Sequence, residues 1–402
     1  MTTLTASDTP WRRDAAVIGL VGLAHASSHF SHLLLPLMFP VLMSTFELSY
    51  AQAGALMSVF FVVSGIGQAS AGFVVDRMGA RPVMFASLLI FAVACIAVGM
   101  AESYAGLMFG AVLLGLGNCA FHPVDFTILN QRVSAPRLGY AFSAHGLTGN
   151  LGWATAPVFM VGISAASDWR TAYFAASALF LGILVLLVWQ RDMLTTHVVS
   201  HKKEEAQDHT LAFLKIPVVW WCFAFFFLST MTLAVVQSFA VSILQAMHAV
   251  SFEAATMTLT AYMLCAAAGM FAGGFVAARW PTHSDRVVAT CMAAGAVCMA
   301  LCGSGWFGGT LSMVVLATTG LAIGVGGPSR DMMIKKATPK GATGRVYGMV
   351  YSGLDVGFAV SPLIFGVFMD HGWYGATLIG AAVVLLSSVF VALGVGRRTL
   401  AR

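Results

Sequence analysis

The chain has 402 residues, a formal net charge of +5, and a composition with 59% hydrophobic but only 9% charged residues. Soluble domains carry about 25% charged residues, so this chain lacks the polar groups needed to cover a water-soluble globule. The composition excludes a cytosolic enzyme, a nucleic-acid-binding domain, a secreted disulfide scaffold and a disordered protein, and it indicates a polytopic membrane protein.

Twelve apolar stretches are long enough to cross a bilayer, because a hydrocarbon core about 30 Å thick needs roughly 20 apolar residues per helix. The stretches are continuous rather than alternating, which favours helices over the strands of a barrel. They cover residues 15–43, 50–75, 83–101, 104–130, 139–163, 170–190, 216–244, 251–278, 287–303, 310–333, 345–368 and 374–396. We therefore expect an all-α polytopic membrane protein with twelve transmembrane helices.

The basic residues follow these spans in an alternating pattern. Of the 21 Lys and Arg residues, 20 fall on one side of the predicted topology and only Arg170 falls on the other. Because Lys and Arg are enriched in cytoplasmic loops, both termini are predicted to be cytoplasmic. Most of the chain is therefore expected to be embedded in the lipid bilayer. No nucleic-acid partner is expected.

A polar segment at residues 197–210 separates two halves of the chain. We expect an N-terminal six-helix bundle at 1–190, a cytoplasmic linker at 191–215 and a C-terminal six-helix bundle at 216–402. An internal repeat links the two bundles. At an offset of 205, Gly115, Pro123, Gly152 and Pro157 return as Gly320, Pro328, Gly357 and Pro362. Pseudo-symmetric bundles of this kind are typical of secondary transporters, whose substrate site lies near the midplane between the halves.

The loop between the second and third spans reads GFVVDRMGAR at residues 72–81. It resembles the loop signature of the major facilitator superfamily, G-x-x-x-D-R-x-G-x-R, with Pro82 where a further basic residue is usual. The resemblance implies a transporter that works by alternating access. It also implies a conformational latch in which Asp76 docks at the start of the eleventh helix, and the alternative is a loop that only enforces topology. The latch would comprise Gly72, Asp76, Arg77, Gly79, Arg81 and Arg345.

Two shorter segments are similar to one branch of this superfamily, the proteins related to the bacterial fosmidomycin-resistance exporter. They are GLGNCAFHP at residues 115–123, which includes His122, and GATGRV at residues 341–346. The similarity implies a bacterial inner-membrane location and export. Drug–proton antiporters of the superfamily usually carry an arginine where this chain has Ala111, which argues against antiport but not against transport.

Ionisable residues within membrane spans are costly and mark a transport pathway. His25, His29 and His32 are spaced by four and three residues, so they share one side of the first helix, which Pro36 and Pro40 are expected to bend. Asp355 lies near the middle of span eleven and is predicted to be the proton-coupling residue, with a structural hydrogen bond as the alternative. The predicted substrate and proton pathway comprises His25, His29, His32, His122, Asn150, Trp153, Gln237, Tyr262 and Asp355.

Asp125 and Arg330 are also related by the 205-residue offset. We expect them to pair as a cytoplasmic gate, and the alternative is two unrelated interface charges. Other acidic residues belong to loops or helix ends and are expected to be solvated. They are Glu47, Glu102, Asp168, Glu253 and Asp370.

These patterns predict a secondary transporter of a small molecule, driven by a proton gradient and acting as a monomer. ATP is not expected to drive it, because the sequence has no phosphate-binding loop. An exporter or antiporter is the leading prediction. A symporting importer, a metal-dependent membrane enzyme, a metal importer and a sensor that kept the fold are the alternatives. No catalytic residue, cofactor or metal site is predicted.

Overall fold

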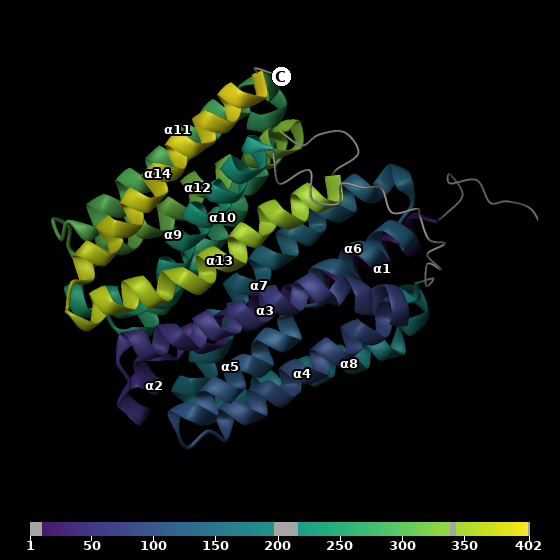
Figure 1. Cartoon of the computed structure of the whole chain (residues 1–402). Helices are drawn as coiled ribbons and strands as arrows, with labels where there is room; N and C mark the ends of the chain where they lie inside the picture. Colours follow the sequence, from purple (N-terminus) through teal and green to yellow (C-terminus); the bar gives the residue numbers. More distant parts are fainter. Residues whose placement is uncertain (1–9, 197–215, 338–342, 401–402) are drawn as a thin grey trace, which may run out of the picture. The chain divides into compact units, whose positions relative to one another are not determined.

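The computed structural model describes residues 10–196, 216–337 and 343–400, and all regular structure within these ranges is helical (Figure 1). The first eight α-helices are α1 (Trp11–Leu37), α2 (Phe39–Phe46), α3 (Tyr50–Met78), α4 (Ala80–Gly99), α5 (Tyr104–Asn118), α6 (Phe121–Arg132), α7 (Leu138–Ala166) and α8 (Trp169–Trp189). The remaining six are α9 (Pro217–His248), α10 (Phe252–Arg279), α11 (Ser284–Gly303), α12 (Gly309–Ala337), α13 (Thr343–Asp370) and α14 (Tyr374–Leu400). Short 3-10 turns cover Ala135–Arg137, Arg191–Leu194 and Pro281–His283.

Each of the twelve stretches predicted to span the membrane is helical in the structure. Among the described residues, eleven helical segments are long and apolar enough to cross a membrane. The remaining predicted span, the fifth, corresponds to α7, which has 29 residues and carries the polar side chains of His145, Thr148 and Asn150. The expectation of an all-α, multi-pass membrane protein is confirmed.

Two of the predicted spans are broken. The first ends as α1 at Leu37, turns at Met38 and continues as α2 with Pro40 in its first turn, which confirms the predicted bend. Proline is tolerated in a first turn because the N–H groups there have no intrahelical partner. The fourth span was expected to be continuous, but it breaks between α5 and α6, where Pro123 occupies the first turn of α6.

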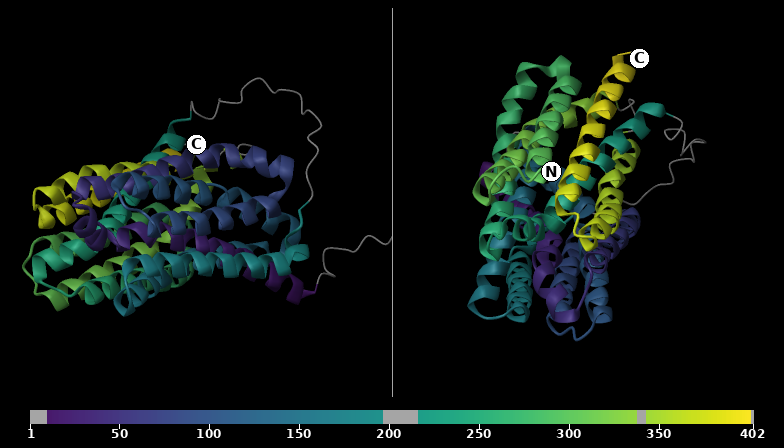
Figure 2. Two further views of the ribbon diagram at one scale, coloured as in Figure 1. Left: turned by 90° about the horizontal axis from the view of Figure 1, so that it is seen from below. Right: turned by 90° about the vertical axis from the view of Figure 1, so that its left-hand side faces the viewer.

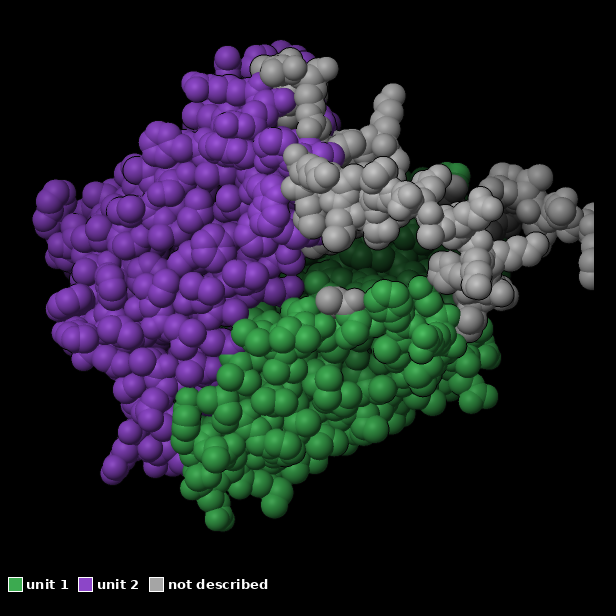
Figure 3. Space-filling view, viewed as in Figure 1, with its two compact units in different colours: residues 1–38, 59–202 green, residues 39–58, 203–402 purple. Residues whose placement is uncertain are grey.

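The chain divides into two compact units (Figure 3). Unit 1 comprises residues 1–38 and 59–202, and unit 2 comprises residues 39–58 and 203–402. The border falls within α3, whose residues 50–58 pack with unit 2. In unit 1, α1 packs against α7, and α4 packs against α5 and α8. In unit 2, α9 packs against α13, α10 against α12, and α11 against α14 (Figures 1 and 2).

The internal repeat is visible in the closest backbone contacts. In unit 1, a Cβ atom on Gly115 of α5 would lie well inside 3.0 Å of the carbonyl oxygen of Phe60 in α3. In unit 2, a Cβ atom on Gly320 of α12 would meet the carbonyl oxygen of Tyr262 in α10 in the same way. Both positions need glycine because the helices touch backbone to backbone, as small residues allow in membrane bundles.

A second glycine contact is repeated. Gly152 of α7 lies against the carbonyl group of Ala26 in α1, and Gly357 of α13 lies against that of Phe227 in α9. The two glycines are related by the 205-residue offset. The repeat found in the sequence is therefore a repeat of helix packing.

Arg170, the one basic residue on the minority side of the predicted topology, has a structural role. Its Nη1 atom donates hydrogen bonds to the carbonyl oxygens of Gly99, at 2.7 Å, and Ala101, at 2.8 Å. These carbonyls end α4, where a cation is favoured by the helix dipole. The guanidinium also lies 4.4 Å from the ring centre of Trp169, which adds a cation–π contact.

Candidate functional site

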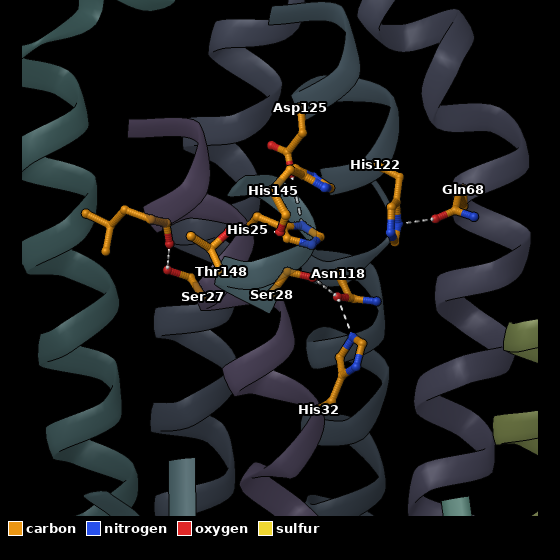
Figure 4. Close-up of polar contacts among 11 residues, drawn as sticks. His25, Ser27, Ser28, His32, Gln68, Asn118, His122, Asp125, His145 and Thr148 are labelled. Carbon is orange, nitrogen blue, oxygen red and sulfur yellow. Dashed lines mark hydrogen bonds and ion pairs between the residues drawn. The ribbon is translucent and has the colours of Figure 1, made fainter. Parts of the chain in front are cut away.

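A buried carboxylate lies between two imidazoles inside unit 1 (Figure 4). The side chain of Asp125, on α6, is fully buried. Its Oδ2 atom lies 3.0 Å from Nε2 of His145, on α7, and 3.2 Å from Nδ1 of His25, on α1. The rings of His25 and His145 stack with their centres 3.5 Å apart. We call these three residues the His–Asp–His cluster.

Two further histidines flank the cluster. The ring centre of His29 lies 4.5 Å from that of His25. The ring centre of His122, on α6, lies 5.6 Å from that of His25. His122 is only half-buried, and its Nδ1 atom lies 3.1 Å from Oε1 of Gln68 on α3. The cluster therefore continues through imidazole rings towards a less buried part of unit 1.

A second polar network lies further along α1. Asn118, at the end of α5, accepts hydrogen bonds at Oδ1 from Ser28 Oγ at 2.6 Å and from His32 Nε2 at 3.1 Å. Asn118 Nδ2 donates to Ser64 Oγ at 2.9 Å, and Trp153 Nε1 donates to His32 Nδ1 at 3.3 Å. Because an indole N–H can only donate, His32 Nδ1 must accept, and the proton sits on Nε2. The network thus holds His32 as one neutral tautomer.

Helix spacing explains how these groups meet. His25, His29 and His32 lie along one side of α1, as their spacing predicts, with His29 and His32 ring centres 5.1 Å apart. Gly149 of α7 faces them. A Cβ atom there would lie 2.8 Å from His29 Nδ1 and 3.0 Å from His25 Nε2. Glycine at this position therefore leaves room for both rings beside α7.

The cluster lacks a fixed cation. Among the residues that the structure describes, the ion-pair partners of Asp125 are His25 and His145, and its Oδ1 atom has no hydrogen-bond partner. A buried charge is stable only when paired or bound to a metal. The arrangement can therefore hold one additional positive charge, either a proton on an imidazole or a metal ion.

The structure brings together His25, His29, His32, His122 and Trp153 from the predicted pathway. Sequence reasoning missed four members of these networks, His145, Asn118, Gln68 and Ser64. For His145, the residue spacing within α7 could have indicated its place in the site. His145, Gly149 and Trp153 recur every four residues and so share one helix face.

Other predicted pathway residues have different surroundings. Asn150 of α7 is buried and donates through Nδ2 to the carbonyl oxygen of Gly146 at 3.1 Å. Gln237, Tyr262 and Asp355 belong to unit 2, on α9, α10 and α13. The first two are buried and Asp355 is half-buried.

The two residues of the predicted gate each have partners within their own unit. Asp125 contacts the two histidines of the cluster. Arg330 donates from Nε to Oδ1 of Asp331 at 2.9 Å, and its guanidinium lies 5.2 Å from the ring centre of Phe226. A gate between them would require both residues to exchange partners.

The predicted latch loop forms the tight turn between α3 and α4. Gly79 has φ +82°, a conformation that favours glycine, and Ala80 N–H donates to Thr196 Oγ1 at 2.9 Å. Arg81 Nη1 donates to Thr195 Oγ1 at 2.9 Å. A Cβ atom on Gly72 would meet nothing within 4 Å. Asp76 and Arg77 are exposed in the last turn of α3, and the side chain of Arg345 lies outside the described residues.

A membrane protein built from two repeated helical units, with titratable groups buried inside one of them, has the architecture of a secondary transporter. The sequence pattern of the Major Facilitator Superfamily matches residues 21–284 and 226–401 of the chain. The chain belongs to this family, whose members are transporters and not enzymes.

Two bacterial relatives illustrate the similarity. The fosmidomycin resistance protein of Escherichia coli (strain K12) is 24% identical over 277 residues, which cover 67% of this chain and 66% of the relative. The MFS-type transporter YfnC of Bacillus subtilis (strain 168) is 23% identical over 204 residues, which cover 50% of this chain and 49% of the relative. The chain thus spans less than two thirds of the length of these relatives.

Solved structures match nearly the whole fold. A nucleoside transporter, NupG, superposes with a TM-score of 0.78 over 94% of this chain and 99% of its own, at 14% identity. A bacterial homologue of the human lysosomal transporter Spinster superposes with a TM-score of 0.75 over 98% of this chain and 99% of its own, also at 14% identity. At this identity the likeness shows the fold alone.

Proposed function

We propose that the chain is a proton-coupled secondary transporter that moves a small organic solute across the bacterial inner membrane by alternating access. It acts as a monomer and draws its energy from the proton gradient, without a cofactor. The observation that carries the proposal is the His–Asp–His cluster, in which a buried carboxylate at membrane depth contacts two imidazoles. Such groups are costly in a membrane and mark ion or substrate pathways.

The cluster suits proton transfer because the carboxylate of Asp125 lies at hydrogen-bonding distance from two titratable rings, those of His25 and His145. Histidine gains and loses its proton in the physiological pH range, and a protonated ring beside Asp125 would neutralise the carboxylate. His32, in contrast, is held neutral by Trp153 and Asn118. We assign His25, His145 and Asp125 to proton handling and the His32–Asn118–Trp153 network to solute binding.

Unit 2 contributes a second candidate for coupling. Asp355 is half-buried on α13, within a helix that is apolar enough to span the membrane. An acidic residue at that depth can carry a proton through the cycle. We propose that Asp355 couples proton movement to solute movement, with Gln237, Tyr262 and Asn150 as polar contacts along the same pathway.

Sidedness follows from the basic residues of the loops. Their segregation to one side of the predicted topology supports cytoplasmic termini. On that side we propose two devices that act when the cytoplasmic entrance is closed. Asp125 would leave its histidines to pair with Arg330, and the loop with Asp76 and Arg81 would dock as a latch.

Export by proton antiport is the direction we propose. It is supported by the relative named for fosmidomycin resistance and by one in Mycobacterium tuberculosis named as a multidrug resistance protein B homologue, 25% identical over 189 residues. Uptake by symport is the second candidate. A relative in Cupriavidus pinatubonensis named as a probable 4-methylmuconolactone transporter, 27% identical over 155 residues, supports a small organic solute in either direction.

Proteoliposomes that contain a pH-sensitive dye test coupling and direction together. Purified protein is first screened for thermal stabilisation by a ligand panel that includes fosmidomycin and 4-methylmuconolactone. Each stabilising compound is then added outside the vesicles. Antiport predicts that protons leave the lumen as the compound enters, and symport predicts that they enter with it.

Two substitutions locate the coupling residues. Asp355→Asn should abolish proton movement while ligand-induced stabilisation remains, because the amide keeps the shape of the side chain but cannot titrate. Asp125→Asn should do the same if the cluster handles protons. Glu102→Gln, at an exposed position between helices, is the matched control. Solute flux that is unchanged when the pH gradient is collapsed would refute proton coupling.

A further inference from the structure

The His–Asp–His cluster contains buried polar atoms that the protein does not satisfy. Asp125 Oδ1, His25 Nδ1 and His29 Nδ1 make no hydrogen bond with the described residues. His25 Nδ1 lies 3.2 Å from Asp125 Oδ2 but without hydrogen-bond alignment. Buried donors and acceptors are nearly always satisfied in native proteins. Unsatisfied atoms on both Asp125 and His25, two members of the cluster, indicate that a bound species completes the site.

We propose that His25, Asp125 and His145 bind one divalent first-row transition-metal ion. Each residue offers one ligand atom, and these atoms lie within 4.8 Å of one another. In a tetrahedral site with bonds of about 2.0–2.1 Å, neighbouring ligand atoms are about 3.3 Å apart. The two nitrogen–oxygen separations, 3.0 and 3.2 Å, approach that value. Because an imidazole binds a metal in the plane of its ring, the stacked rings of His25 and His145 would have to rotate out of their stack to complete the coordination.

The donor set selects the class of metal. Two imidazoles with one carboxylate suit Zn²⁺, Co²⁺, Ni²⁺ or Fe²⁺. Mg²⁺ and Ca²⁺ prefer all-oxygen sites, and Cu⁺ prefers thiolate or thioether ligands. His29 lies outside this group of ligand atoms, although its ring centre is 4.5 Å from that of His25, so the fourth position is left to water.

In the arrangement described here, a metal ion would pair more of the buried oxygen and nitrogen atoms of the cluster than a proton would. A proton on one imidazole would neutralise Asp125 but leave Oδ1 without a partner. A metal ion can bind a carboxylate through one or both oxygens and the nitrogens at the same time. His122 lies beside His25 at a half-buried position, so an ion has an imidazole-lined approach to the cluster.

The inference is argued from the geometry of unit 1 alone, although it involves the same three residues that we assign to proton handling. The test uses the purified full-length protein in detergent with any affinity tag removed. Histidines at 197, 201 and 209 are replaced by glutamine in the parent protein, because they lie close together in the sequence and could bind metal themselves. Co²⁺ is titrated by visible absorption, and bound Zn²⁺ is counted by elemental analysis.

One Co²⁺ per chain should bind with the absorption of a low-coordinate nitrogen–oxygen site, and Zn²⁺ should displace it while Mg²⁺ does not. Asp125→Asn and His145→Gln should each weaken metal binding at least about tenfold. Substitution of a residue that only supports a metal ligand already has an effect of that size. Asp14→Asn is the matched control, because Asp14 is the other fully buried carboxylate among the described residues of unit 1 and lies outside the cluster. It should leave binding unchanged.

A parallel measurement on the parent protein tests the site even if the variants fail to fold. In the parent protein, X-ray absorption spectroscopy of the bound Zn²⁺ should show scattering from two imidazole ligands. Absence of bound Co²⁺ and Zn²⁺ would overturn the proposal. So would Zn²⁺ binding that Asp125→Asn leaves intact, or a zinc spectrum without imidazole ligands. Flux assays of Asp355→Asn, which changes a residue of unit 2 outside the cluster, distinguish a failure of proton coupling from a failure of metal binding.

Discussion

The carboxylate of Asp370 accepts a hydrogen bond from the backbone N–H of Tyr50, so the last residue of α13 caps the first residue of α3. The neighbouring N–H of Ala51 donates to the other carboxylate oxygen at 3.0 Å. One helical turn further, Gly54 lies against the carbonyl group of Pro362, and Ser58 Oγ donates to the carbonyl oxygen of Ala359 at 2.6 Å. Within unit 2, the start of α3 is therefore fixed to the end of α13.

Removing this cap should loosen the first turn of α3. The first N–H groups of a helix have no intrahelical partner, and loss of a capping side chain costs about 0.5–2 kcal/mol. Asp370→Ala should lower the thermal stability accordingly and speed hydrogen exchange at residues 50–54. Asp370→Asn should retain part of the effect, and Glu102→Ala should change neither. Equal exchange rates in all three variants would contradict the cap.

Asp168 provides a pH-dependent cap at the start of α8. Its Oδ1 atom accepts the backbone N–H of Thr171 at 2.9 Å, and its Oδ2 atom accepts the hydroxyl at 2.8 Å. These hydrogen bonds, the backbone one first, hold the pKa of Asp168 below its ordinary value. Because the pKa is lower in the folded chain, the carboxylate contributes stability above about pH 4 and loses it as the pH falls through the folded value.

The measurement is the difference in melting temperature between the parent protein and Asp168→Asn. Asparagine also caps helices but does not titrate, so the variant provides a pH-independent reference at this position. The parent should be the more stable protein at pH 7, and its advantage should shrink as the pH falls below about 4 and through the lowered pKa of Asp168. A difference that stays constant over this range would show that the ionised cap contributes nothing.

Asp14 fixes the start of α1 to the connection between α6 and α7. Its buried carboxylate accepts hydrogen bonds from Ser134 Oγ and from Arg137 Nη1, the latter at 2.7 Å. Replacing a buried acceptor leaves its donors unsatisfied, at a cost of about 1–3 kcal/mol. Asp14→Ala should therefore destabilise unit 1 by that amount in thermal or denaturant unfolding. Arg137→Gln should cost less, because Arg137 is about one third exposed.

The paired glycines predict matched losses of stability. Gly152→Ala and Gly357→Ala should each destabilise the protein, because the new methyl group would collide with a backbone carbonyl that cannot rotate away. Gly162→Ala is the control, since a Cβ atom there would meet nothing within 4 Å. Thermal melting of the three variants checks the prediction. A neutral Gly152→Ala variant would show that α1 and α7 are less closely packed than described.

The sequence predicted the helices well, because hydrophobic length alone decides which segments can span a bilayer. It also placed three histidines on one side of α1, because local helix geometry determines that relationship. It missed the break between α5 and α6, which depends on how Pro123 and Asn118 fit among neighbouring helices. It likewise treated Asp168 and Asp370 as solvated. Both are exposed, yet each accepts backbone hydrogen bonds that only the folded chain supplies.

The candidate site was harder to predict than the fold. His145 and Asp125 are 20 residues apart and meet because two helices turn back on each other. Asn118 joins Ser28 and His32 from a third helix. Contacts between helices depend on rotation about each helix axis, and a hydropathy pattern specifies that rotation only loosely. Residue spacing within α7 was the one available signal for His145.

The duplicated helix packing supports different chemistry in the two halves. Val350 is the repeat counterpart of His145, 205 residues further along the chain. It belongs to a buried apolar cluster with Phe225 and Phe226. The corresponding seam in unit 1 contains a carboxylate and imidazoles instead. The side chains of Val350, Phe225 and Phe226 neither titrate nor bind metal ions, so their packing does not depend on pH or on metal concentration. At this position, protons or metal ions have groups to bind in unit 1 and none in the apolar cluster of unit 2, whose titratable candidate, Asp355, lies elsewhere on α13.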